Sequence, residues 1–126
     1  MVPGNGSAAN SSLVANGFVY SIQPPNNYYA QLNANGTTGA WQTDTNSLPQ
    51  GFNSFTTVSA NGYVYVMGGI NGGSYLATVY YAQLNSNGTT GVWQTSTNSL
   101  PYPYENATSV TANGSIKCVS RRLSIT

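Results

Sequence analysis

The feature that most constrains this chain is an internal repeat. Residues 28–49 and 80–101, offset by 52 positions, are identical at 19 of 22 positions. The three differences are Ala34/Ser86, Ala40/Val92 and Asp44/Ser96. A fixed period of this length is typical of a structural unit that cannot bury its apolar surface alone and stacks against neighbouring copies of itself. The sequence therefore predicts a repeat architecture rather than a domain built around one central core.

A second repeated element is Ala-Asn-Gly, which occurs at residues 15–17, 60–62 and 112–114 and is followed each time by a further strand-like stretch. Asn-Gly is the strongest short-range signal for a β-hairpin, because a type I′ turn needs a positive φ at both central residues. The three sites predict tight turns between the first and second strands of successive units. Asn35-Gly36 and Asn87-Gly88 predict longer turns between the third and fourth strands.

The complete unit predicts four short strands, and no stretch of the chain has the 3.6-residue period of a helix. In the strand expected at 63–67, the tyrosines and the methionine point to one face and the two valines to the other. Apolar residues on both faces indicate a sheet that is covered on both sides, since a sandwich strand normally leaves one face in water. The four strands are expected at residues 54–59, 63–67, 78–84 and 91–95.

A four-stranded antiparallel unit of about 50 residues is typical of a β-propeller blade. The unit also resembles the kelch repeat, since Gly68-Gly69 follows the second strand, Tyr80-Tyr81 lies in the third and Trp93 in the fourth. The resemblance is strongest to bacterial kelch-like propellers and covers residues 12–116. It implies an all-β fold of four-stranded antiparallel kelch-like blades, in an incomplete propeller of two blades plus part of a third.

The first and third units depart from the kelch pattern. Pro24-Pro25 stands where the double glycine would be, and residues 115–121 replace the pattern of residues 63–69. All three basic residues, Lys117, Arg121 and Arg122, follow this break, as a truncated reading frame would leave them. The expected boundaries are a leader at 1–11, blade 1 at 12–49 with a shortened loop, blade 2 at 50–101, a partial blade 3 at 102–120 and a basic tail at 121–126.

Two blades and a fragment cannot close a ring, because propellers have about 4–8 blades. An open stack leaves apolar blade faces uncovered, which favours self-association. The expected partners are therefore other copies of the chain or the rest of a longer propeller.

Composition excludes several classes of protein. Charged residues make up 4% of the chain and the formal net charge is +1, whereas an ordinary soluble domain has about 25% charged residues. This leaves no basic surface for nucleic acid, and no apolar run approaches the roughly 18 residues of a membrane span. One cysteine and no histidine argue against a disulfide framework and a Cys/His zinc set, so no metal and no cofactor are expected.

Richness in Asn, Thr, Ser, Gly and Tyr favours an extracellular or cell-surface location, although residues 1–6 lack the features of a secretory signal.

The inventory of reactive side chains argues against an enzyme, because without histidine neither a Ser-His-Asp nor a Cys-His arrangement exists. Asp44 and Glu105 are the only acids that could form a glycosidase-like pair, but both are expected in solvated loops. Cys118 occupies the position of Val66 one repeat earlier and is interpreted as a small strand hydrophobe. Some kelch-like propellers are oxidases with a copper centre of Tyr, His and Cys, and the resemblance therefore implies a site whose histidine ligands are missing here.

The loops between strands carry the candidate ligand-binding residues, because propeller loops are the usual place for ligands. Tyrosine rings stack on sugar faces and amides bind hydroxyl groups, so these loops favour a carbohydrate or a protein ligand. The candidates are Asn71, Tyr75, Tyr102 and Tyr104.

Five further residues are interpreted as structural parts of the blade. The two tryptophans are expected to pack between blades, and the double glycine to let the chain leave the second strand without colliding with the next blade. The five are Trp41, Trp93, Gly68, Gly69 and Tyr81.

Three functions stay open from the sequence. The leading one is a non-enzymatic extracellular or surface module that acts as a scaffold or binds a carbohydrate or protein through its loops. The second is a structural or adhesive subunit whose open blade faces stack into a fibre, which the low charge favours because little repulsion opposes edge pairing. The third is a fragment of a larger propeller enzyme.

Overall fold

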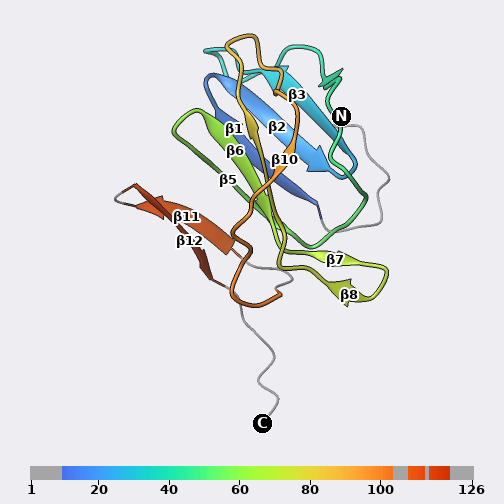
Figure 1. Ribbon diagram of the computed structural model, residues 1–126. Helices are drawn as coiled ribbons and strands as arrows, with labels where there is room; N and C mark the ends of the chain where they lie inside the picture. The colour runs from blue at the N-terminus through green and yellow to red at the C-terminus, as the bar shows by residue number, and fades with distance from the viewer. Residues whose placement is uncertain (1–9, 104–107, 113, 120–126) are drawn as a thin grey trace.

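Within residues 10–103, 108–112 and 114–119, which the computed structural model describes, every regular element is a β-strand. Two four-stranded antiparallel sheets lie face to face, and two two-stranded hairpins accompany them (Figure 1). The predicted all-β fold of four-stranded antiparallel sheets is confirmed. Asn-Gly turns and short β-branched or aromatic runs explain this outcome, because they favour hairpins at every step of the chain.

Blade 1 is the first four-stranded sheet, with its strands in the order β1-β2-β3-β4. Each strand pairs antiparallel with the next, and the central register places Tyr20 opposite Tyr29. The strands are β1 (Ser11–Ala15), β2 (Phe18–Gln23), β3 (Asn26–Gln31) and β4 (Gln42–Thr43).

Blade 2 is the second four-stranded sheet, in the order β10-β9-β6-β5. Its second and third strands are separated by a small hairpin, β7 (Ile70–Asn71) and β8 (Ser74–Tyr75), where the sequence predicted no strand. The strands of the blade are β5 (Thr56–Ala60), β6 (Tyr63–Met67), β9 (Val79–Gln83) and β10 (Gln94–Thr95).

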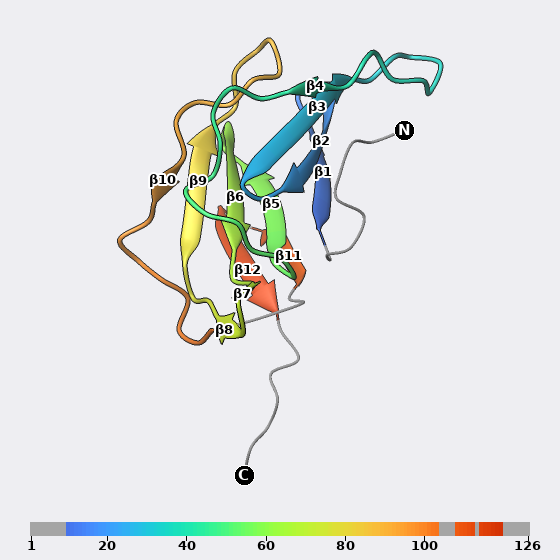
Figure 2. The same cartoon turned by 90° about the vertical axis from the view of Figure 1, so that its right-hand side faces the viewer.

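A third pair of strands, β11 (Thr108–Ala112) and β12 (Ser115–Val119), forms what we call the blade-3 hairpin. β5 contacts both β1 and β11, so the first strands of the three units lie side by side (Figure 2). The hairpin therefore follows blade 2 in the same way that blade 2 follows blade 1.

The tight turns between first and second strands have the predicted backbone geometry. Asn16 and Gly17 have φ values of 53° and 80°, and Asn61 and Gly62 have 55° and 82°. Both central residues are thus in the left-handed region that a type I′ turn requires. The third predicted turn includes Asn113, which lies outside the described residues.

The fourth strand is shorter than predicted because a β-bulge interrupts its pairing. Gly91 N–H donates to the carbonyl of Gln83, and pairing resumes where Gln94 lies opposite Tyr81. Two residues, Val92 and Trp93, therefore lie opposite a single residue of β9. A bulge turns side chains away from simple alternation, and here Val92 is 71% exposed whereas Trp93 is 6% exposed.

Each blade has two faces, because successive side chains along a strand alternate. We call the face of blade 2 that meets blade 1 its front face, and the opposite one its back face. The front face of blade 2 carries Val64, Val66, Tyr80 and Ala82, and the front face of blade 1 carries the equivalent Val19, Ser21, Tyr28 and Ala30. The back face of blade 1 carries Phe18, Tyr20, Ile22 and Tyr29, and that of blade 2 carries Tyr63, Tyr65, Met67 and Tyr81.

The hydrophobic core lies between the back face of blade 1 and the front face of blade 2. Tyr20, Ile22, Val64 and Val66 are fully buried, and one continuous cluster joins them to Trp93. Full burial of a side chain such as Val or Ile stabilises a protein by about 1.5–3 kcal/mol. Stacking of the blades is therefore the main source of stability, as the repeat predicts.

Candidate functional site

The loop end of blade 2 brings together three of the four candidate ligand-binding residues. The loop between β6 and β9 and the loop that follows β10 leave the sheet at the same end, and Leu100 N–H donates to the carbonyl of Ala77 at 2.8 Å. This bond places Tyr75 and Tyr102 in adjoining loops, where they are 46% and 51% exposed. Tyr104 lies outside the described residues.

Asn71 lies at the tip of the β7–β8 hairpin and is held by a short chain of hydrogen bonds. Its Nδ2 donates to Gln50 Oε1 at 2.8 Å, and Gln50 Nε2 donates to the Tyr80 hydroxyl at 2.9 Å. Gln50 was not predicted, because nothing in its sequence neighbourhood marks it as more than a polar residue after Pro49. The chain fixes the hairpin relative to the body of the blade and leaves Asn71 exposed.

The glycine pair Gly68-Gly69 has a left-handed backbone, with φ values of 72° and 108°. A Cβ on Gly69 would lie 2.8 Å from the carbonyl oxygen of Asn53 and 3.1 Å from the Phe52 ring. The close neighbour is therefore the segment that leads into β5 of the same blade. The prediction that the next blade is the obstacle was wrong in this respect, because sequence spacing does not reveal which segment folds back onto the loop.

Asp44 is not in a solvated loop, contrary to prediction; it is 4% exposed and lies between the two blades. Its Oδ2 accepts from the Thr90 backbone N–H of blade 2 at 2.8 Å and from Asn27 Nδ2 at 3.2 Å, and its Oδ1 accepts from Asn46 N–H at 3.1 Å. Asn46 Nδ2 in turn donates to the Thr90 carbonyl at 2.8 Å. The Asp44 carboxylate thus links the two blades, and it accepts three hydrogen bonds from protein donors.

The second acid, Glu105, lies outside the described residues, so the glycosidase-like pair has no geometry to support it. Cys118 lies in β12 opposite Ser109. No group of three or more His, Cys, Asp or Glu side chains is gathered anywhere in the described ranges. Among the same residues, no helix is long and apolar enough to cross a membrane.

Tyr20 has a clearly displaced pKa. Burial, with smaller contributions from the Asp44 charge and from Tyr29, raises the pKa of Tyr20 to about 12. Its hydroxyl makes no hydrogen bond to any described residue. These are the properties of a core residue whose buried hydroxyl has no hydrogen-bond partner among the described residues.

The two structural tryptophans have different surroundings. Trp93 packs between the blades, as predicted, whereas Trp41 is half-buried on the front face of blade 1, where no described segment covers it. Tyr81, the remaining structural residue, lies on the back face of blade 2, stacks on Tyr65 with ring centroids 6.2 Å apart and donates its hydroxyl to Gln94 Oε1.

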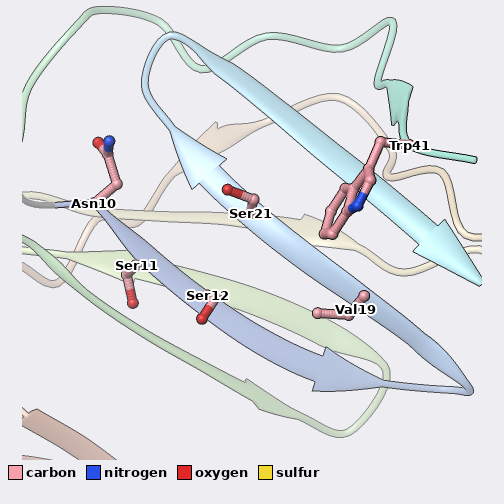
Figure 3. A pocket seen from close by; sticks show the side chains of 6 residues that line it. All are labelled: Asn10, Ser11, Ser12, Val19, Ser21 and Trp41. Carbon is pink, nitrogen blue, oxygen red and sulfur yellow. The ribbon is translucent and has the colours of Figure 1, made fainter. Parts of the chain in front are cut away.

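A pocket of about 350 Å³ lies on the front face of blade 1, beside Trp41 (Figure 3). Ser12 and Ser21 are paired across β1 and β2, and the Trp41 ring lies on the same side of the sheet. The sequence did not mark this pocket, because serines in a Ser-rich chain carry no signal of their own. Its lining consists of Asn10, Ser11, Ser12, Val19, Ser21 and Trp41.

Comparison with known proteins agrees with this architecture. Residues 51–81 match the Kelch motif. The chain is similar to the solved structure of YjhT, a kelch-type propeller protein, with a TM-score of 0.73 and 18% identity over 88% of this chain and 32% of that one. It therefore spans about a third of the length of that structure. The comparison with curated proteins found no match.

Stacked four-stranded blades, a Kelch motif in the second blade and the similarity to YjhT together define the fold as that of a kelch-type β-propeller. The chain carries two complete blades of such a propeller, and the described part of its third unit is one hairpin.

Proposed function

We propose that this kelch-type module is a non-enzymatic, extracellular or cell-surface binding module that takes neutral carbohydrate at the loop end of blade 2. The observation that carries the proposal is the pair of exposed tyrosines, Tyr75 and Tyr102, on two loops tied together by the Leu100–Ala77 hydrogen bond. An exposed aromatic ring offers a flat apolar face on which a sugar ring can stack.

The polar groups beside the two rings support a neutral ligand. Residues 68–78 and 96–103 contain no charged side chain, and Asn71 supplies an exposed amide that both donates and accepts hydrogen bonds. Sugar hydroxyls need partners of this kind, whereas an acidic or basic ligand would need a compensating charge. The composition, rich in Asn, Thr, Ser, Gly and Tyr, supports the surface location.

The proposal is tested by titrating the chain with neutral oligosaccharides, namely cello-, xylo-, malto- and chito-oligosaccharides, and following backbone amide shifts by NMR. We expect one class to shift the amides of residues 71–76 and 100–103. Replacing both Tyr75 and Tyr102 by alanine should weaken binding by roughly tenfold or more, because each stacked ring contributes about 0.5–1.5 kcal/mol.

Tyr63→Ala is the matched control, because Tyr63 is an exposed tyrosine at the opposite end of β6. We expect this variant to bind like the parent chain. If none of the four oligosaccharide classes shifts these amides, or if the double variant binds as well as Tyr63→Ala, the proposal is wrong.

A further inference from the structure

We propose that the front face of blade 1 is a docking surface for a second copy of this chain, and that the Trp41 pocket receives Lys117 of that copy. The contact joins two different surfaces, the front face of blade 1 on one copy and the blade-3 hairpin on the other. It is therefore a head-to-tail contact, and it is independent of carbohydrate binding at the loop end.

The repeat itself shows what the front face of blade 1 is built to contact. Trp93, Thr90 and Gly88 of blade 2 are buried against blade 1, and a Cβ on Gly88 would lie 2.6 Å from the Phe18 ring. The identical residues of blade 1 are Trp41, which is half-buried, Thr38, which is exposed, and Gly36, whose Cβ would have no neighbour within 4 Å. The same surface is thus covered in one blade and open in the other.

The blade-3 hairpin carries the surface that would cover it. β12 corresponds to β6 at the 52-residue offset, so Lys117 takes the place of Tyr65, and of Tyr20 in blade 1. Tyr20 is the back-face residue that lies in the core cluster with Val64, Val66 and Trp93 of the next blade. Lys117 is exposed on the corresponding face of β12, while Ile116, its neighbour of opposite orientation, is half-buried.

The back-face residue of one unit and the front face that would contact it differ in matching ways at two contacts, blade 1 on blade 2 and the blade-3 hairpin on blade 1. Where Tyr20 is the back-face residue, the front face of blade 2 offers Val66. Where Lys117 is the back-face residue, the front face of blade 1 offers Ser21 and Ser12 beside Trp41. A lysine stem packs along apolar surface while its ammonium stays with polar partners, and an ammonium is attracted to the face of an indole ring. The pocket provides both, and Lys117 is the only cationic residue in the described ranges.

Sedimentation velocity of the 126-residue chain over a wide concentration range tests the association. We expect concentration-dependent oligomers, and we expect Lys117→Met and Trp41→Ala to raise the apparent dissociation constant by at least about fivefold, in line with the strength of a partly desolvated cation–π contact. Val92→Ala, which trims an exposed apolar residue of blade 2 outside the proposed contact, is the control and should associate like the parent. A monomer at all concentrations, or association that neither variant weakens, overturns the proposal.

Thiol cross-linking tests the head-to-tail geometry separately. In a Cys118→Val background, one copy carries Lys117→Cys and the other Ser21→Cys, and a short bismaleimide spans the distance of about 10 Å between packed sheet faces, which is too long for a direct disulfide. We expect a covalent dimer when the two copies are mixed and little in either sample alone, because a heterologous contact brings position 117 of one copy opposite position 21 of the other. Equal trapping in the unmixed samples contradicts this geometry. Electron microscopy of the parent chain then shows whether the contact closes into rings or extends into filaments.

Discussion

Blades 1 and 2 share an almost identical outer hairpin, yet the two copies experience different surroundings. In blade 2 the hairpin packs its tryptophan and threonine against blade 1, whereas in blade 1 the same residues lie on the open front face. Burial is therefore set by the neighbouring blade and not by the local sequence. The comparison also explains one of the three sequence differences, because Asp44 faces blade 2 and bonds to it, while Ser96 follows β10 toward a third unit whose described part is a single hairpin.

The largest difference between the blades is expected at the tryptophans. Trp93→Ala should lower the free energy of unfolding by about 3–5 kcal/mol, because it leaves a cavity between the blades. At protein concentrations low enough for the chain to be monomeric, Trp41→Ala should cost only about 1 kcal/mol, since the half-buried ring then has water on one side. Urea denaturation followed by circular dichroism measures both, and Trp93→Phe keeps the comparison measurable if the alanine variant does not fold. Equal losses at the two positions would show that blade 1 is covered in solution.

A smaller difference is expected at the acid that distinguishes the copies. Asp44→Ala leaves the buried N–H groups of Thr90 and Asn27, and the half-buried N–H of Asn46, without their acceptor and should cost about 2–4 kcal/mol. Ser96→Ala removes one exposed hydrogen bond, to Asn98 N–H, and should change stability by no more than about 0.5 kcal/mol.

Asp44→Ser compares the two blades directly, because it gives blade 1 the residue that blade 2 carries at the same position. We expect an intermediate loss, since a serine hydroxyl is shorter and uncharged and reaches fewer of the three donors. Chemical denaturation at pH 7 measures all three variants. If Asp44→Ala is no more destabilising than Ser96→Ala, the hydrogen bonds of Asp44 do not contribute to stability.

The fold was largely predictable because its signals are local. Asn-Gly pairs fix the turns, apolar residues on both faces indicate stacked sheets, and the period fixes the unit. What could not be predicted depends on which surfaces meet. Asp44 was expected in solvent because a loop acid normally is, and the structure buries it because Thr90, 46 residues further along the chain, presents a backbone donor there. The two tryptophans are identical in sequence context, so only the stacking order separates them.

The candidate site was predictable in part for the same reason. Tyr75 and Tyr102 were identified because they lie outside the duplicated strands, in the loops that link strands, and the loops that carry them do adjoin. Gln50 and the Trp41 pocket were missed, since each depends on contacts between segments that the sequence does not connect. Residues outside the described ranges, Tyr104 and Glu105 among them, keep the status of predictions.

Alkaline pH should also distinguish the two blades, because the equivalent tyrosines Tyr20 and Tyr65 are buried to different degrees. The pKa of Tyr20 is raised to about 12 in the folded chain, while an unperturbed tyrosine titrates near about 10. The folded state thus holds the neutral form more tightly than the unfolded state, so this contribution is fully present below about pH 10 and is lost as the pH rises toward 12. A difference of this size corresponds to roughly 2–3 kcal/mol.

Tyr20→Phe should remove that alkaline loss and leave stability at pH 7 nearly unchanged, because the buried hydroxyl has no hydrogen-bond partner among the described residues. Tyr65→Phe, at the half-buried position of blade 2, is the matched control and should keep the loss of the parent chain. Urea midpoints measured from pH 8 to pH 12 separate the two. A Tyr20→Phe curve that falls in parallel with the parent would mean that the inter-blade core already admits water at Tyr20, and the contrast between a covered and an open blade face would then be weaker than the burial of the two tryptophans indicates.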